Sequence, residues 1–128
     1  MFSILRPYIF SLDPEAAHDL AIKSLKVNFL PESLFKVEDE GILKTNLFNK
    51  EFKNPIGLAA GFDKSAEVYN SLFKLGYGFV EVGTVTPKSQ LGNPKPRIFR
   101  LEQDQALINR LGFNNHGSDT VSRRISKN

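Results

Sequence analysis

Apolar residues recur at helical spacing through the first part of the chain. Intervals of three, four and three residues place four side chains on one helical face: Phe2, Leu5, Ile9 and Leu12. Pro7 lies inside this stretch and is expected to limit or kink the helix, because proline lacks the backbone N–H that an inner turn needs.

A second helix is predicted to begin at the sequence Asp13-Pro14-Glu15. Asp13 can cap the helix, Pro14 suits its first turn, and Glu15 complements the helix dipole. An apolar stripe then follows at Ala17, Leu20, Ala21 and Leu25, and a further apolar cluster surrounds Pro31 at Phe29, Leu30, Leu34 and Phe35. Two interpretations stay open: a small helical cap packed on a core, or an amphipathic helix pair that lies on a membrane or frames the entrance for an apolar ligand.

The pattern changes at residues 38–53, from an acidic stretch to an alternation typical of short strands. We therefore predict a boundary near residue 40, with a helical extension at residues 1–40 and a second unit at residues 41–128.

Residues 54–85 follow a strand, helix, strand pattern. A short apolar run at 55–61 predicts a buried strand, a helix is expected from about Ser65 to Gly76, and residues 79–85 predict the next strand. Such a βαβ unit implies parallel strands and an α/β fold. In α/β enzymes the chemistry lies at the carboxyl ends of the strands.

Residues 86–117 form a long segment whose prolines and glycines exclude a continuous helix. Residues 97–101 are predicted to form one strand of a surface hairpin. A last helix is expected from Ser118, with Ser118 or Asp119 as its cap.

Composition narrows the function classes. The 128 residues are 41% hydrophobic and 24% charged, as in ordinary globular proteins, and lack cysteine, which excludes disulfides, thiolate metal sites and a cysteine nucleophile. Residues 1–53 hold seven basic and eight acidic residues, whereas residues 54–128 hold ten and six, so the second part favours anionic partners. No basic run of five occurs, and we expect no nucleic-acid partner. No apolar run reaches membrane-spanning length, and neither a signal peptide nor a transit peptide is predicted.

Two clusters could carry chemistry. Residues 59–64 place small residues and Lys64 after a predicted strand, which suits a flat ring or a phosphate, or else forms a tight turn with an exposed lysine. Residues 109–115 combine asparagines with glycine, which suits a small planar molecule or an asparagine-rich turn. Gly83 and Thr84 could contact a cofactor or simply end a strand. The two histidines are 98 residues apart, which predicts no metal site.

Three motifs occur together and in order: NPIGLAAGFDK, GYGFVEVGTVTPKSQLGNPKPRIFRL and INRLGFNNHG. They resemble the N-terminal portion of class 2, quinone-dependent dihydroorotate dehydrogenase. The sequence LDPEAAH at residues 12–18 is similar to the helical extension of that class.

The resemblance implies an α/β fold, the N-terminal part of a (β/α)8 TIM barrel preceded by a small helical cap. It further implies the cofactor FMN and the oxidation of dihydroorotate to orotate in pyrimidine biosynthesis. In that family a hydride passes to flavin N5, and ubiquinone or another quinone reoxidises the flavin.

The resemblance also assigns roles to residues. The implied flavin contacts are Ala60, Gly61, Phe62, Asp63, Lys64 and Thr84, and the implied substrate contacts are Lys64, Asn109, Arg110, Leu111, Gly112 and Phe113. The implied quinone tunnel includes His18 and Arg100. The helical extension would dock on a membrane, on the cytoplasmic side of the bacterial inner membrane or on the mitochondrial inner membrane of a eukaryote.

Length sets a limit on this expectation. A TIM barrel needs about 250 residues, and this sequence holds at most two barrel strands. The family's catalytic serine is expected on a later loop, beyond Asn128, so we predict no catalytic base in this chain and no activity from it alone. The alternatives are a non-catalytic remnant and a module that binds a membrane or a partner.

Overall fold

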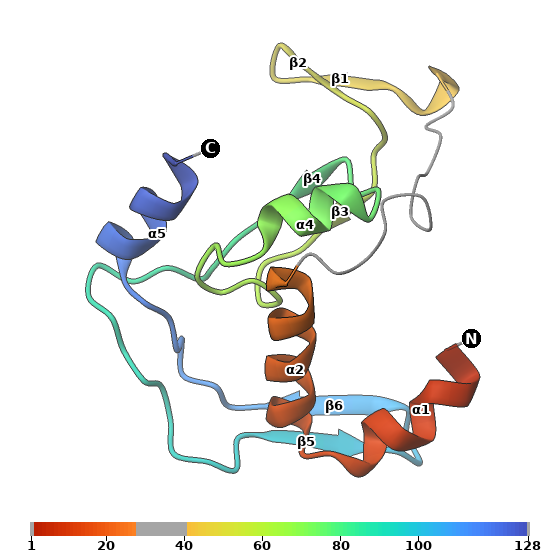
Figure 1. Cartoon of the computed structure of the whole chain (residues 1–128), viewed down its shortest axis with the longest axis vertical. Coiled ribbons are helices and arrows are strands. Elements are labelled where there is room, and N and C mark those ends of the chain that lie inside the picture. The colour runs from red at the N-terminus through yellow and green to blue at the C-terminus, as the bar shows by residue number, and fades with distance from the viewer. Residues whose placement is uncertain (1, 28–40, 128) are drawn as a thin grey trace.

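The structure is a computed structural model that describes residues 2–27 and 41–127. Two helices form its N-terminal part, α1 (Phe2–Ser11) and α2 (Pro14–Lys26) (Figure 1). Helix α1 continues through Pro7, so the proline does not end it. The carbonyl that Pro7 cannot bond belongs to the exposed residue Ser3, where water can replace the missing donor. The predicted apolar cluster at residues 29–35 and the predicted boundary near residue 40 lie outside the described residues.

Helix α2 begins as predicted. Asp13 is its cap, and the carboxylate accepts hydrogen bonds from the backbone N–H groups of Glu15 and Ala16, both at 3.0 Å. Leu25 of the predicted stripe is buried, but Leu20 is 54% exposed, and Ile22, which was not in the stripe, is buried instead. Ile22 and Leu25 form the core with residues of the following βαβ unit, chiefly Val68 and Leu72.

The βαβ unit consists of β3 (Gly57–Leu58), α4 (Tyr69–Lys74) and β4 (Phe79–Val80). The two strands pair in parallel, Gly57 beside Phe79 and Leu58 beside Val80, which confirms the predicted topology. All three elements are shorter than predicted, and the helix begins at Tyr69 rather than near Ser65. Residues 60–68 are turns and bends in which Ala66 has a positive φ of 53°, a conformation that no α-helix contains.

Two antiparallel hairpins flank this unit. A 3-10 turn (Gly41–Leu43) precedes β1 (Thr45–Leu47) and β2 (Lys50–Phe52), and the second hairpin joins β5 (Ile98–Leu101) to β6 (Ala106–Asn109). The second hairpin confirms the strand predicted at residues 97–101.

The final helix is α5 (Ser118–Ile125). Its cap is Gly117, with φ of +81°, so the predicted capping by Ser118 or Asp119 is wrong. The Ser118 hydroxyl instead donates to the carbonyl of Pro87, 3.2 Å away, and so ties the helix to the long preceding segment.

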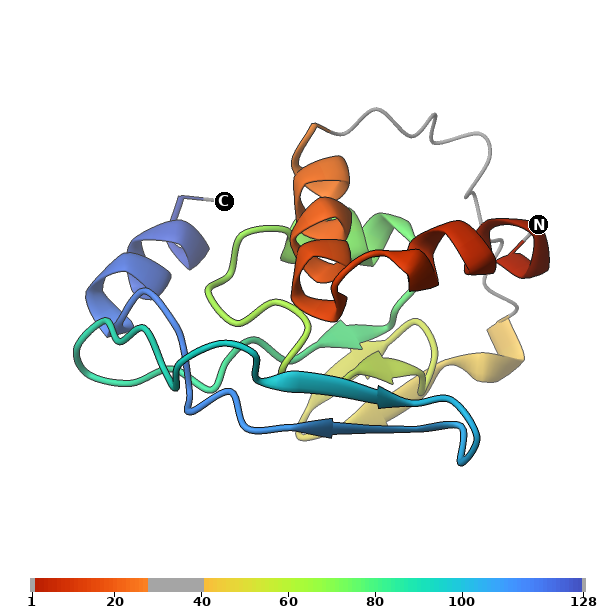
Figure 2. The same cartoon turned by 90° about the horizontal axis from the view of Figure 1, so that it is seen from below.

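Helix α2 stands over the β5–β6 hairpin and packs against both β5 and α4 (Figures 1 and 2). The β1–β2 hairpin and α5 lie at separate ends of the molecule. The described residues thus form helices and three two-stranded sheets without a closed barrel. None of the helices within residues 2–27 and 41–127 is long and apolar enough to cross a membrane.

Candidate functional site

A cavity of about 290 Å³ lies at the carboxyl ends of the parallel strands β3 and β4. It brings together most of the residues predicted to contact flavin or substrate: Ala60, Gly61, Lys64, Thr84, Asn109, Arg110, Leu111, Gly112 and Phe113. Ala60, Gly61 and Lys64 therefore meet residues 109–113 in one site, although Lys64 and Asn109 are 45 positions apart in the sequence. We call it the strand-end cavity.

The wall of the strand-end cavity is suited to a flat group. Gly61 has φ of +111°, and a Cβ atom added there would meet no other atom within 4 Å, so the backbone borders open space. Asn114 also lines the cavity, and its side-chain oxygen is buried without a hydrogen-bond partner. An exposed backbone surface and an unused acceptor fit a planar, hydrogen-bonding molecule such as the flavin or the pyrimidine expected from the sequence.

Lys64 lines both this cavity and a second one, as do Leu111 and Asn114. Nζ of Lys64 lies 3.4 Å from Nε2 of His18. Burial lowers the pKa of Lys64, and burial together with the neighbouring Lys64 charge lowers the pKa of His18. An anion in the strand-end cavity would offset the unfavourable burial of the lysine charge.

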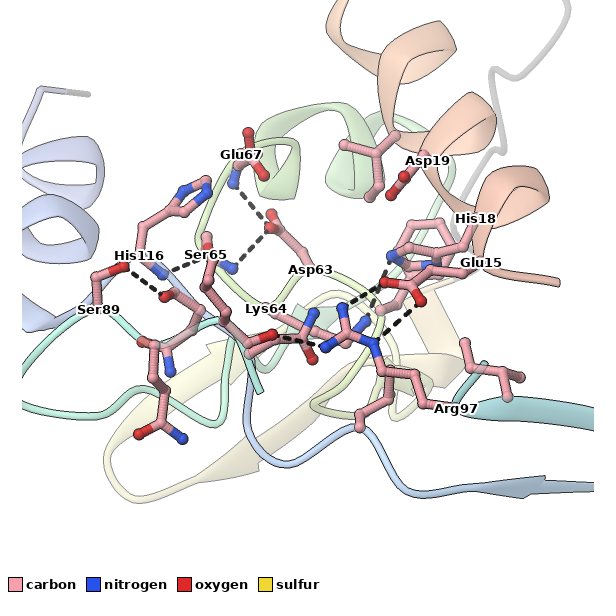
Figure 3. A pocket seen from close by; sticks show the side chains of 18 residues that line it. Glu15, His18, Asp19, Asp63, Lys64, Ser65, Glu67, Ser89, Arg97 and His116 are labelled. Atoms are coloured by element: carbon pink, nitrogen blue, oxygen red, sulfur yellow. Dashed lines mark hydrogen bonds and ion pairs between the residues drawn. The ribbon is translucent and has the colours of Figure 1, made fainter. Parts of the chain in front are cut away.

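The second cavity, of about 260 Å³, lies beneath the start of α2 and is lined by charged side chains (Figure 3). We call it the helix-side cavity. Glu15 and Arg97 form a two-pronged ion pair in its wall, with Nη2 to Oε1 at 2.5 Å and Nε to Oε2 at 3.0 Å. The hydrogen bond from Arg97 is the main reason that the pKa of Glu15 is lowered.

Two predicted flavin residues line the helix-side cavity instead of the strand-end cavity. The Phe62 ring packs edge-on against the His18 ring, with centroids 5.2 Å apart. Asp63 is 1% exposed, and its carboxylate accepts hydrogen bonds from the backbone N–H groups of Ser65, Glu67 and Val68. These hydrogen bonds stabilise the turn that precedes α4, so Asp63 has a structural role.

The two predicted quinone residues lie apart. His18 lines the helix-side cavity, whereas Arg100 lines neither cavity. Arg100 donates to the carbonyls of Phe10 at 3.0 Å and Leu12 at 2.8 Å, and its guanidinium lies over the Phe10 ring. Arg100 therefore fixes the junction between α1 and α2 on strand β5.

Sequence reasoning missed several site residues. Asn93 lines the strand-end cavity, and the ion pair of Glu15 and Arg97 forms part of the wall of the helix-side cavity. Asn114, which also lines the strand-end cavity, belongs to the cluster predicted at residues 109–115 but not to the substrate contacts that the resemblance implied. The Glu15–Arg97 pair joins positions 82 residues apart and leaves no local signal in the sequence.

Among the residues that the structure describes, no group of three or more His, Asp or Glu side chains could hold a metal ion. The arrangement is a βαβ unit with cations and amides at the carboxyl ends of its strands. This is the class of site found in α/β enzymes, and it suits an anionic, planar ligand.

Comparison with known proteins agrees with this class. The family model for dihydroorotate dehydrogenase matches residues 42–128. The dihydroorotate dehydrogenase (quinone) of Erythrobacter litoralis is 51% identical over 98% of this chain, which spans 36% of that relative. The mitochondrial enzyme of Mus musculus is 52% identical over 89% of the chain, which spans 28% of that relative. The crystal structure of the Eimeria tenella enzyme in complex with ferulenol superposes with a TM-score of 0.82, at 52% identity, over 90% of this chain and 30% of that one.

The chain therefore belongs to the dihydroorotate dehydrogenase family, as its motifs indicated. It spans about a third of the length of the curated relatives it matches.

Proposed function

We propose that this chain supplies the flavin-contacting and substrate-contacting N-terminal part of an FMN-dependent, quinone-linked dihydroorotate dehydrogenase. The observation that carries the proposal is the strand-end cavity, where Ala60, Gly61 and Lys64 meet residues 109–113. Family membership supports the reaction, the oxidation of dihydroorotate to orotate.

The residues present fit the expected cofactor. Ala60, Gly61 and Thr84 would hold the flavin against open backbone, and Lys64 would place a cation beside it. Bound FMN would supply an acceptor for the hydride that leaves dihydroorotate. Lys64 would stabilise the negative charge that accompanies this transfer, because a fixed cation in a half-buried site acts strongly on nearby charge.

The substrate side of the cavity is formed by residues 109–113 together with Asn93 and Asn114. Amide side chains supply both donors and acceptors, which suits the alternating N–H and C=O groups of a pyrimidine ring. Lys64 would pair with the substrate carboxylate. The group that removes the substrate proton is expected on the family's serine-bearing loop, outside residues 1–128.

We assign the quinone to the side of α1 and α2. His18 lines the helix-side cavity next to Lys64, and Arg100 holds the junction of the two helices. Apolar side chains on α1 are open, with Ile4 and Tyr8 72% and 73% exposed. These features support peripheral docking of α1 on a membrane surface, from which an apolar quinone could enter.

A hybrid enzyme tests the proposal. In it, this chain replaces the matching N-terminal part of the Erythrobacter litoralis relative. We expect the purified hybrid to retain FMN and to reduce a quinone when dihydroorotate is added. A hybrid that folds and retains flavin but leaves dihydroorotate unoxidised would contradict the proposal.

A further inference from the structure

Arg97 is a charged residue with only 7% of its surface exposed, directly before strand β5. Its guanidinium uses one edge for the carboxylate of Glu15 on α2. A further guanidinium nitrogen, Nη1, donates to the carbonyls of Leu91 at 2.6 Å and Asn93 at 2.9 Å. One side chain therefore holds the first turn of α2 and the loop at residues 91–93 at the same time.

The loop at residues 91–93 in turn holds the predicted substrate segment. The Asn93 backbone N–H donates to the carbonyl of Leu111 at 3.0 Å, and its side-chain amide donates to the carbonyl of Arg110 at 2.7 Å. Gly92 packs so closely that an added Cβ would lie 2.1 Å from the Leu111 carbonyl oxygen and 2.9 Å from Nη1 of Arg97. No other residue type fits between the arginine and the substrate segment.

We propose that the Glu15–Arg97 pair positions the substrate segment by linking the helical extension to residues 110–112 through the loop at residues 91–93. The assignment of residues 110–112 to substrate binding rests on the proposed function, whereas the link itself rests on the contacts above. Arg97 and Glu15 are positioning residues, since neither lines the strand-end cavity.

The chemistry of the pair explains why arginine occupies this position. A guanidinium presents donors on several edges in one rigid plane, so it can bind a carboxylate and two carbonyls together. Lysine carries the same charge on a flexible stem and cannot serve all three acceptors in that geometry. The Lys95 amine lies 3.4 Å from Oε1 of Glu15, but its side chain is 62% exposed. Lys95 therefore adds positive charge beside Glu15 without replacing the two hydrogen bonds that Arg97 donates to it.

Hydrogen exchange of the full chain, read at single amides, tests the link. In Arg97→Lys we expect the Asn93 amide to exchange at least about tenfold faster, because its loop loses the guanidinium donors. The Glu81 amide, which donates to Leu58 between the parallel strands, should exchange at the unchanged rate. Glu15→Gln should accelerate exchange of the Asn93 amide to a smaller extent than Arg97→Lys. Glu15→Asp keeps the negative charge and should accelerate this exchange less than Glu15→Gln.

The control is Glu51→Gln, which removes an exposed ion pair with Lys44 in the β1–β2 hairpin and should leave the Asn93 amide unaffected. Equal acceleration at Asn93 and Glu81 in Arg97→Lys would reveal general destabilisation and overturn the proposal. An unprotected Asn93 amide in the unmodified chain would also overturn it.

Orotate binding to the hybrid enzyme separates the two proposals. We expect Arg97→Lys to raise the Kd of orotate several-fold, with Glu51→Gln unchanged. Faster Asn93 exchange without weaker orotate binding would overturn the positioning role. If the unmodified hybrid failed to bind orotate, the proposed function would fail, and the exchange experiment would still decide whether the link exists.

Discussion

Lys64 lies at the wall that the two cavities share, with its amine beside the imidazole of His18. Burial lowers its pKa, so the surroundings disfavour its charge until an anion arrives. A cation in such a position binds a negative partner more strongly than an exposed lysine does, because water screens it less.

Replacing Lys64 by alanine tests that role. In the hybrid enzyme, we expect Lys64→Ala to slow flavin reduction by dihydroorotate about 100-fold to 1000-fold, as loss of one preorganised charge-stabilising group does in other enzymes. Stopped-flow absorbance of the flavin would measure the rate. Lys44→Ala, on the exposed β1–β2 hairpin, is the control and should reduce its flavin normally. A near-normal rate in Lys64→Ala would exclude the assigned role.

His18 predicts a pH dependence of stability. Burial is the main cause that lowers its pKa below 6.5 in the folded chain, so the unfolded chain binds the proton more readily. The free energy of unfolding should therefore decrease as the pH falls below 6.5, towards the lower folded-state pKa, and should be insensitive to this group above that range.

Urea unfolding at about pH 7.5 and about pH 5.5 would measure the effect, since both values lie above the range in which carboxylates titrate. The decrease between them should be smaller in His18→Gln than in the unmodified chain. Equal decreases in the two proteins would rule out a contribution from His18.

At the scale of elements, the turn at residues 63–68 determines where α4 begins. The buried Asp63 carboxylate accepts three backbone N–H groups, which would otherwise be buried without partners. We expect Asp63→Ala to lower the free energy of unfolding by about 3 kcal/mol, because several charge-assisted hydrogen bonds are lost together.

Asp13→Ala provides a matched comparison, since it removes an exposed helix cap with two hydrogen bonds. Its expected cost is about 1 kcal/mol. Chemical denaturation of both variants would measure the difference. A cost for Asp63→Ala no larger than that for Asp13→Ala would show that the carboxylate does not organise the turn.

The same turn shows what sequence could and could not predict. The Asp13 cap and the βαβ order were predictable because they depend on neighbouring residues and on local periodicity. The start of α4 was not, because the Asp63 carboxylate supports a positive φ at Ala66 that delays the helix. The exposed position of Leu20 was also missed, since the direction from which the core packs against α2 depends on the distant α4.

The candidate site follows the same division. Residues 59–64 and 109–115 each stood out locally, and the parallel pairing of β3 with β4 explains why the first cluster lies near Gly83 and Thr84. The second cluster begins at the last residue of β6, in a separate hairpin, and only the family resemblance predicted that it shares a site with Lys64. The ion pair of Arg97 depends on Glu15, which lies 82 residues away on α2. A local sequence pattern cannot predict a contact between residues so far apart in the chain.

At the scale of the molecule, the apolar side chains of α1 predict membrane binding. Ile4 and Tyr8 are largely exposed, and each would leave water if α1 lay on a bilayer. We expect the double change Ile4→Ser and Tyr8→Ser to reduce binding to anionic phospholipid vesicles at least about tenfold, since each buried apolar side chain contributes about 1.5–3 kcal/mol. Co-sedimentation with the vesicles would measure it.

Ile42→Ser is the control for that experiment, because Ile42 is 86% exposed but lies on the 3-10 turn away from α1. It should bind vesicles as the unmodified chain does. Equal losses from both changes would indicate general hydrophobic adsorption instead of docking through α1.

The isolated 128-residue chain, not joined to the remaining part of a relative, is expected to lack the activity of the hybrid enzyme. Large apolar side chains are open, with Phe113 in the strand-end cavity 64% exposed and Phe79 on β4 43% exposed, and among the described residues the sheet of β3 and β4 has two strands. The chain spans about a third of its relatives, so the proposed cofactor would contact only the part of a binding surface that residues 1–128 supply. We expect the purified 128-residue chain to retain no stoichiometric flavin and to leave dihydroorotate unoxidised. The hybrid enzyme, in contrast, should retain flavin and oxidise dihydroorotate. Flavin absorbance per chain would decide the matter: one flavin per isolated chain would mean that the residues of the strand-end cavity hold the cofactor without further support.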